Sequence, residues 1–327
     1  MKSRHQTDTL RTPKAIRIRI PKVIDLLLVS DPDQIQWLNR HPDIGRPLDS
    51  SIGPLHRWIG RRLHTDMGFG GEVLPVFLPR SDENRAKRQH QLDEALEDAH
   101  GLPGEERDTI AEYVSGKADP DDIGAIVQQW CGRLFDAHYR SSKETYEAGR
   151  LLARWPTSLP WQTWRQRING NLDRAKRLLS MHADSDLYCI HATSIGTQNV
   201  LRSIRRLRLA AQSPKRRELP PDDILRQCLA TPAAVLRGCK SDIHVPFLDH
   251  PITPQTVVVF LVARAFTTSG DLDVAFLGDD WSACPARRVI PEMLRAVWHA
   301  AHHDEAREKI SPKTNNTKSR LWSWAVS

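Results

Sequence analysis

Cys284 is the residue whose type and position offer the clearest chemistry in this sequence. It follows a polar turn that contains Gly278, Asp279 and Asp280, and Pro285 stands directly after it. Because proline is favoured at the first position of a helix, this spacing predicts a thiol at a helix N-terminus. The helix dipole and the unpaired amides there lower the pKa of a thiol and stabilise its thiolate. Such a thiolate is a nucleophile or a soft ligand for a metal.

A structural role for Cys284 is the alternative, because lone cysteines are commonly small buried hydrophobic residues. The chain has five cysteines, and no two of them form a CxxC pair. A structural zinc site built from thiolates is therefore not expected. The odd number and wide spacing of the cysteines argue against a disulfide framework and favour a reducing, cytoplasmic location.

Two groups of polar residues have a spacing that also permits chemistry. One group lies near the end of the last expected helix: His299, His302, His303 and Asp304. Its spacing would allow the side chains to bind a metal ion from one helix face. The favoured alternative is that these histidines interact with the helix dipole. The other group borders the central helical region: His182, Asp184, Asp186 and His191. We expect its members either to contact a substrate or to face solvent.

The elements that must position these residues are mostly helical. Apolar residues recur in pairs four residues apart through residues 284–299, which is typical of a helix with one buried face. Other helices are expected at 34–39, 81–95, 122–135 and 172–209, and from Asp222 after Pro220 and Pro221. Strands are expected at 24–29, 243–247 and 256–263.

The composition is that of a globular protein of 327 residues, 39% hydrophobic and 27% charged. We expect residues 1–20 to form a flexible basic tail and residues 21–327 to form a single domain. The longest apolar run, residues 257–263, is far too short to span a membrane. The net charge is +7, but Lys and Arg are scattered and no nucleic-acid-binding signature is present, so nucleic acid is not an expected partner. An acidic electron-transfer protein fits the charge.

Together with the segments before it, the Cys284 region resembles the C-terminal half of a cytochrome P450. In that family a strand and a glycine-bearing turn lead to a cysteine that ligates heme iron and opens a long helix. Leu277, Gly278 and Cys284 stand at the matching offsets. The segment PPDDILRQCLATPAAVLRGCKSDIHVPFLDHPITPQTVVVFLVARA matches the family's preceding helix and hairpin. It has an ExxR-like pair followed by a proline and an arginine: Asp223, Arg226, Pro232 and Arg237.

Earlier segments resemble further parts of the family in the same order, so that the resemblance covers most of the chain. LLLVSDPDQIQWLNRHPDIGRPL resembles its early strand and helix, and SDENRAKRQHQL resembles the helix that contacts a heme propionate. In the latter, Arg88 stands at the propionate position, with Lys87 one residue away as the alternative. CIHATSIGTQNVL resembles the oxygen-activating helix and offers Thr193 and Thr197.

The resemblance implies a mainly α fold with a small β component. It implies heme b between the 193–197 helix and the Cys284 loop, with Cys284 as the iron ligand. Arg88 and Arg237 would bind the propionates, Asp223 and Arg226 would be buried behind the cysteine loop, and Gly278 would shape that loop. The implied function is a heme-thiolate oxidoreductase of monooxygenase or peroxygenase type. Its partners would be a small organic substrate and a ferredoxin-type electron donor or peroxide.

Several positions depart from the family pattern. The cysteine loop has other residues where the family has a Phe, a Gly, a basic residue and a Gly: Leu277, Asp280, Ser282 and Ala286. Ile195 stands where the oxygen-activating helix has an acid that helps to deliver protons. The alternative function is therefore a heme-dependent isomerase or dehydratase, or a heme-free enzyme or binding protein.

The supporting residues have structural alternatives as well. Asp223 and Arg226 have the spacing of an ordinary surface ion pair. Arg88 and Arg237 could be solvated charges, and Thr197 could donate its hydroxyl to the backbone of its own helix.

Overall fold

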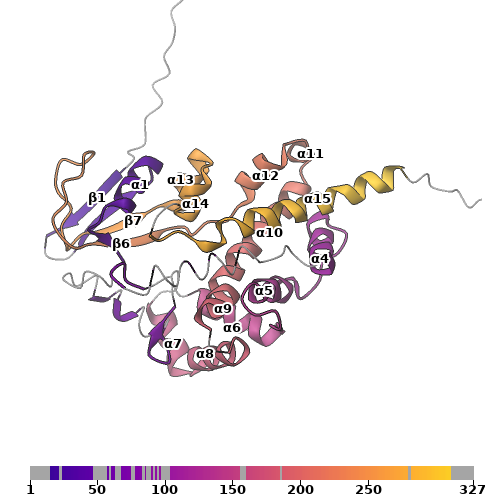
Figure 1. The fold of residues 1–327 in the computed structure, drawn as a ribbon, viewed down its shortest axis with the longest axis horizontal. Helices are drawn as coiled ribbons and strands as arrows, with labels where there is room; N and C mark the ends of the chain where they lie inside the picture. The colour runs from indigo at the N-terminus through magenta and orange to yellow at the C-terminus, as the bar shows by residue number, and fades with distance from the viewer. Residues whose placement is uncertain are drawn as a thin grey trace, which may run out of the picture.

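The computed structural model describes residues 15–21, 24–46, 57–58, 60–62, 68–74, 78–82, 85, 90, 93, 96, 104–154, 160–184, 186–278 and 281–310. Figure 1 shows a sheet at one end of the molecule and a body of helices at the other. Two short strands, β4 (Gly68–Phe69) and β5 (Glu72–Val73), form a separate hairpin. No helix of the described residues is both long and apolar enough to cross a membrane.

The main sheet has five strands in the order β1-β2-β7-β6-β3. They are β1 (Ala15–Ile20), β2 (Ile24–Val29), β3 (Ile44–Gly45), β6 (Val235–Cys239) and β7 (Val257–Phe260). β2 and β7 pair in parallel, whereas the other neighbours are antiparallel. The N-terminal part of the chain is thereby joined to the segment that leads to Cys284.

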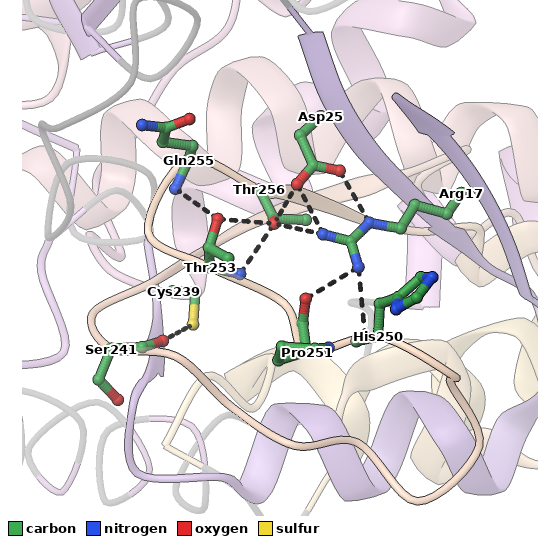
Figure 2. A network of polar contacts seen from close by, with 9 residues as sticks. All are labelled: Arg17, Asp25, Cys239, Ser241, His250, Pro251, Thr253, Gln255 and Thr256. Atoms are coloured by element: carbon green, nitrogen blue, oxygen red, sulfur yellow. Dashed lines mark hydrogen bonds and ion pairs between the residues drawn. The ribbon is translucent and has the colours of Figure 1, made fainter. Parts of the chain in front are cut away.

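An Arg17–Asp25 ion pair fixes the edge of this sheet to the 250–256 loop (Figure 2). Arg17 donates from Nε and Nη2 to Asp25 at 2.9 and 2.7 Å and from Nη1 to the Pro251 carbonyl at 2.8 Å. The Thr256 hydroxyl donates to Asp25 at 2.7 Å. Burial opposes ionisation of Asp25, but the hydrogen bonds from Arg17 and Thr256 and the charges of Arg17 and Arg19 hold its pKa below the ordinary value.

An Asp25→Asn variant should be less stable than the wild type at neutral pH by about 1–2 kcal/mol, because charge-assisted bonds are lost. Since the folded-state pKa is lowered, this contribution is present above the unfolded-state pKa and is lost as the pH falls through the folded-state value. Urea denaturation at neutral pH and at pH ~3 should therefore show the difference shrinking in acid. Asp119→Asn, which removes an exposed ion pair with Arg208, should change little at either pH. A neutral-pH stability equal to the wild type would contradict the prediction for Asp25.

The helices pack against the sheet and against one another in three hydrophobic cores. α1 (Pro32–Arg40), α13 (Val262–Ser269) and α14 (Leu272–Phe276) cover one face of the sheet. A larger helical core joins α4 (Gly104–Ser115), α5 (Ile123–Arg133), α10 (Thr197–Ala211), α12 (Pro221–Cys228) and α15 (Val289–Ile310). A third core contains residues of α6 (Lys143–Ala153), α8 (Asn171–His182) and α9 (Leu187–His191). The remaining described elements are α7 (Pro160–Ile168), α11 (Pro214–Arg217), the π-helix η4 (Ala192–Gly196) and the 3-10 helix η5 (Pro285–Arg287).

Local signals for several helices are confirmed. Asp31 caps α1 by accepting from the Gln34 amide at 3.1 Å, and Pro32 follows as the first helical residue. α5 lies within the expected 122–135 range, and α12 begins at Pro221. Mainly helical architecture with a small β component is therefore correct as a fold class.

Four expectations about element boundaries are wrong. Residues 15–20 belong to β1 rather than to a flexible tail, because they pair with β2 along their whole length. The 172–209 region is interrupted between α8 and α9, where Asp184 has a positive φ of 46°. The antiparallel partner of β7 is β6, whereas residues 243–247 contribute only an isolated bridge between Ile243 and Ile252. The last α-helix begins at Val289 and not at Cys284.

Candidate active site around Cys284

Cys284 ends a loop that begins at the C-terminus of α14. Leu277 terminates that helix with a positive φ of 49°, and the Cys284 amide donates to the Phe276 carbonyl at 2.8 Å, which closes the loop. The Gly278 amide donates to the Asp273 carbonyl at 2.8 Å, and a Cβ at Gly278 would lie 2.7 Å from Asp273 Oδ1. A side chain at this position would displace the Asp273 carboxylate, whereas the nearest backbone atom, Asp273 Cα, would lie 3.4 Å away.

The electrostatic setting of the Cys284 thiol differs from the sequence expectation. Only one turn of 3-10 helix, Pro285–Arg287, follows it before α15 begins. Burial raises the thiol pKa above its ordinary value and outweighs the Ala286 amide and the charge of Arg287, which lower it. The expectation of a lowered pKa is thus wrong for the protein alone, because desolvation of the thiolate exceeds the effect of so short a helical turn. Coordination to a metal ion would deprotonate such a thiol.

Trp281, three residues before Cys284, is surrounded by arginines. The guanidinium carbons of four arginines lie 4.8–5.6 Å from its ring centroid: Arg46, Arg80, Arg85 and Arg237. The indole N–H donates to the Asn39 carbonyl at 2.9 Å, and Arg85 Nε donates to the Trp281 carbonyl at 3.1 Å. This convergence places a high density of positive charge beside the Cys284 loop, where a group with several negative charges would be stabilised.

Arg237 is the member of this cluster that the sequence singled out. Its side chain is fully buried, and it donates from Nε to Asn39 Oδ1 at 3.0 Å and from Nη2 to Ser282 Oγ at 2.8 Å. It is therefore not a solvated charge. Ser282, which stands where the resembling family has a basic residue, instead bonds Arg237 and Asn39. Contact of Arg237 with a propionate stays a prediction.

The resemblance places a second helix across the heme from the Cys284 loop. In the structure this helix is formed by α9, η4 and α10, which follow one another without a break, and residues 192–196 are its π-helical part. Such insertions are rare and frequently occur at functional sites. Thr193 Oγ1 donates to the Cys189 carbonyl at 2.7 Å, and Thr197 Oγ1 donates to the Ala192 carbonyl at 2.9 Å. Both hydroxyls thus bond their own helix, and their catalytic role stays a prediction.

Gln128 of α5 holds the widened turn in place. Its Nε2 donates to the Thr193 carbonyl at 2.7 Å and to the Thr145 carbonyl at 2.9 Å, and its Oε1 accepts from Ser141 at 2.6 Å and from Thr145 Oγ1 at 2.9 Å. The side chain is fully buried. Gly149 of α6 approaches the same turn so closely that a Cβ would lie 2.4 Å from the Thr193 carbonyl oxygen. Two neighbouring helices therefore determine the conformation of this segment.

His191 lies at the start of the widened turn. Its Nδ1 is buried and makes no hydrogen bond. Burial, and to a lesser extent the charge of Arg46, lowers its pKa to about 4, so the imidazole is neutral near pH 7. Arg46, whose charge contributes to this shift, also lies over the Trp281 ring.

Two of the expected site residues lie apart from this cluster. Asp223 and Arg226 are both exposed on α12, and no ion pair joins them in the structure. The expectation of a buried ExxR-like pair is wrong, because α12 buries Ile224, Leu225 and Cys228 and turns the two charges to solvent. The neighbouring Asp222 instead pairs with Arg295 of α15.

Several other expected residues lie outside the described residues, namely Arg88, Lys87, Asp279 and Asp280. The side chains of His303 and Asp304 are also outside them, and His302 Nδ1 lies 2.8 Å from the Trp298 carbonyl. Within the described part of the chain, no group of three or more His, Cys, Asp or Glu side chains is placed to hold a metal ion.

Known proteins resemble this chain in structure and not detectably in sequence. No protein-family model and no curated protein matches it. CYP164A2 of Mycobacterium smegmatis matches over 88% of this chain and 86% of its own, at 15% identity and a TM-score of 0.59. The cytochrome P450 enzyme CxnD, described for C–S bond formation in chuangxinmycin biosynthesis, matches over 88% and 82%, at 12% identity and a TM-score of 0.55. The chain has the cytochrome P450 fold.

A third P450-fold relative is cytochrome P450SP alpha, solved in complex with (R)-ibuprophen. It covers 88% of this chain and 84% of its own, at 12% identity and a TM-score of 0.53. At such identities the likeness establishes the path of the chain. The chemistry of this P450-fold chain depends on its own side chains.

Sequence reasoning missed Trp281 and three of the four arginines around it: Arg46, Arg80 and Arg85. Each is an isolated residue in a different segment, and only the tertiary fold brings them together. The one available signal was an aromatic residue between the turn and Cys284 in a P450-like pattern.

Proposed function

We propose that this chain is a heme-thiolate oxidoreductase that binds heme b through Cys284 and acts on a small organic substrate. The observation that carries the proposal is the convergence of four arginines on Trp281, three residues before a half-buried cysteine, in a chain with the P450 fold. Heme b needs a soft axial ligand for iron and cationic partners for two propionates, and the chain has both kinds of group in one place.

Cys284 suits the ligand role because backbone hydrogen bonds hold it on both sides. The bond from its amide to Phe276 and the tight packing of Gly278 on Asp273 fix the backbone on the N-terminal side. On the C-terminal side, the 3-10 turn bonds Arg287 to the Cys284 carbonyl at 3.2 Å. A thiol positioned in this way would be available as the ligand of heme iron.

The arginine cluster suits the propionates because guanidinium groups bind carboxylates through paired hydrogen bonds. Arg237 supplies a fixed, buried charge, and Asn39 and Ser282 hold its orientation. Arg46, Arg80 and Arg85 also lie over the Trp281 ring and bring further positive charge to the same place. We assign the four arginines jointly to this role, with Arg88 as an additional candidate.

Bound heme supplies oxygen-atom transfer, from dioxygen with electrons or from a peroxide. The chain's own residues favour the peroxide. No Asp or Glu occurs between Leu187 and Ala211, and the Thr193 and Thr197 hydroxyls bond their own helix. Activation of dioxygen needs delivered protons as well as electrons, whereas a peroxide brings both. His191 is the histidine of this helix, and its buried Nδ1, which makes no hydrogen bond, is the atom that we propose to take up or release a proton.

The experiment is to express the full chain with a heme precursor, measure heme content, and record the spectrum after reduction under carbon monoxide. We expect bound heme and a red-shifted Soret band of the thiolate type. Hydrogen peroxide without a reductant should then support oxidation of an aromatic reporter, faster than dioxygen with a reductant. A protein that remains heme-free in the presence of added hemin, or that gives an unshifted band, would overturn the assignment.

A second candidate is a heme-free binding protein that retains the P450 fold. The observation in its favour is that Arg237 already bonds Asn39 and Ser282, and that burial keeps the Cys284 thiol protonated in the chain alone. Absence of heme uptake in the same experiment would select this candidate.

A further inference from the structure

We propose that α7 docks this protein onto an anionic lipid surface through Trp161, Trp164 and Ile168. This inference does not depend on heme binding. α7 follows the 155–159 segment and contacts α8, and Figure 1 shows the two helices side by side at the lower margin of the molecule.

The three apolar side chains form a stripe along α7. Residues three and seven positions apart lie on one face of an α-helix. Trp161 is 64% exposed, Trp164 65% and Ile168 63%. Large apolar side chains are normally buried, and a contiguous exposed group of them marks an interaction surface.

Positive charge flanks this stripe. Arg165 and Arg167 are exposed on the same helix, on either side of the apolar face. No acidic residue occurs between Ala148 and Leu172, and α8 adds the exposed Arg174 and Arg177. Asp173, at the start of α8, is the nearest exposed acid in the sequence.

This composition selects a lipid surface over another protein. A short helix with aromatic residues on one face and arginines beside them lies in the plane of a membrane interface, with its rings at the headgroup level. Arginines near such a surface are attracted to anionic headgroups. Met181 of α8, the helix that α7 contacts, is a further exposed apolar side chain, at 74%. With a net charge of +7, the whole chain adds long-range attraction to the same surface.

The test is co-sedimentation of the full chain with phosphatidylcholine vesicles that contain or lack phosphatidylserine. We expect binding to the anionic vesicles, weakened by salt, and a blue shift of tryptophan fluorescence on binding. Trp161→Ser/Trp164→Ser should lower the partition coefficient by about tenfold or more, because the apolar area buried in the interface is lost. Arg165→Gln/Arg167→Gln should lower both the binding and its salt dependence.

Trp58→Ser is the matched control, because Trp58 is 48% exposed and also lies beside an arginine, Arg62. It should bind vesicles as the wild type does. Circular dichroism would establish that each variant is folded. Equal binding by the Trp161→Ser/Trp164→Ser and Trp58→Ser variants would overturn the proposal, as would a wild type that ignores anionic vesicles. Self-association that depends on Trp161 and Trp164, without vesicle binding, would also overturn it and would assign the stripe to a second copy.

Discussion

A Cys284→Ala variant is expected to lose the red-shifted carbon monoxide band completely, because no thiolate then reaches the iron. Residual heme held by the arginine cluster would give an unshifted band. Cys284→His keeps a metal ligand at the same position of the loop, and should retain heme with a spectrum of the imidazole type. Comparison of absorption spectra for the two variants separates loss of the ligand from loss of the fold.

Cys228→Ala is the control for this prediction. Cys228 is buried in the helical core, on α12, where burial raises its pKa to about 11. This variant should keep the wild-type spectrum. A Cys284→Ala protein with an unchanged thiolate band would show that another residue ligates the iron and would remove Cys284 from the site.

A Gly149→Ala variant is expected to be destabilised by about 3 kcal/mol or more, against the ordinary preference of helices for alanine. The added Cβ would lie 2.4 Å from the Thr193 carbonyl and 2.8 Å from Gln128 Nε2. These are the two groups that form the 2.7 Å bond holding the π-helical turn. The added methyl group would therefore push α6 away from the π-helical turn and would break the buried hydrogen bond between Gln128 and Thr193. Urea denaturation monitored by circular dichroism measures the loss.

Gly196→Ala is the matched control, because it lies in the same π-helical segment. The nearest atoms to its added Cβ are the His191 carbonyl oxygen at 3.6 Å and Ala192 Cβ at 4.0 Å, which are ordinary contacts. Its stability should equal or exceed that of the wild type. A Gly149→Ala protein as stable as Gly196→Ala would mean that α6 does not hold the turn.

Local signals in the sequence were sufficient for several elements. Asp31 and Pro32 stand at the start of α1 because a carboxylate caps the free amides and proline has no amide to satisfy. The apolar run of β2 at residues 26–29 is explained by its position inside the sheet, between β1 and β7. In contrast, β1 alternates isoleucine and arginine within a basic segment, and only its pairing with β2 makes it a strand.

The sequence predicted the properties of the site residues less well, because these depend on how deeply each charged or titratable group is buried. The pattern around Cys284 identified the residue but not the direction of its pKa shift. The shift depends mainly on burial of the thiol, which only the folded chain produces. Asp223 and Arg226 matched a motif by spacing, yet the apolar residues of α12 face the core and leave both charges exposed.

By itself, the sequence determined that Cys284 follows a glycine-bearing turn and that the chain is mainly helical with a P450-like order of segments, because these features depend on local spacing and periodicity. Only the tertiary structure decided which charges surround the cysteine. Arg46, Arg80, Arg85 and Arg237 come from distant segments, and no short-range rule places their guanidinium groups on one indole ring. It also decided that the Thr193 turn is widened, because Gln128 and Gly149 act on it from two other helices.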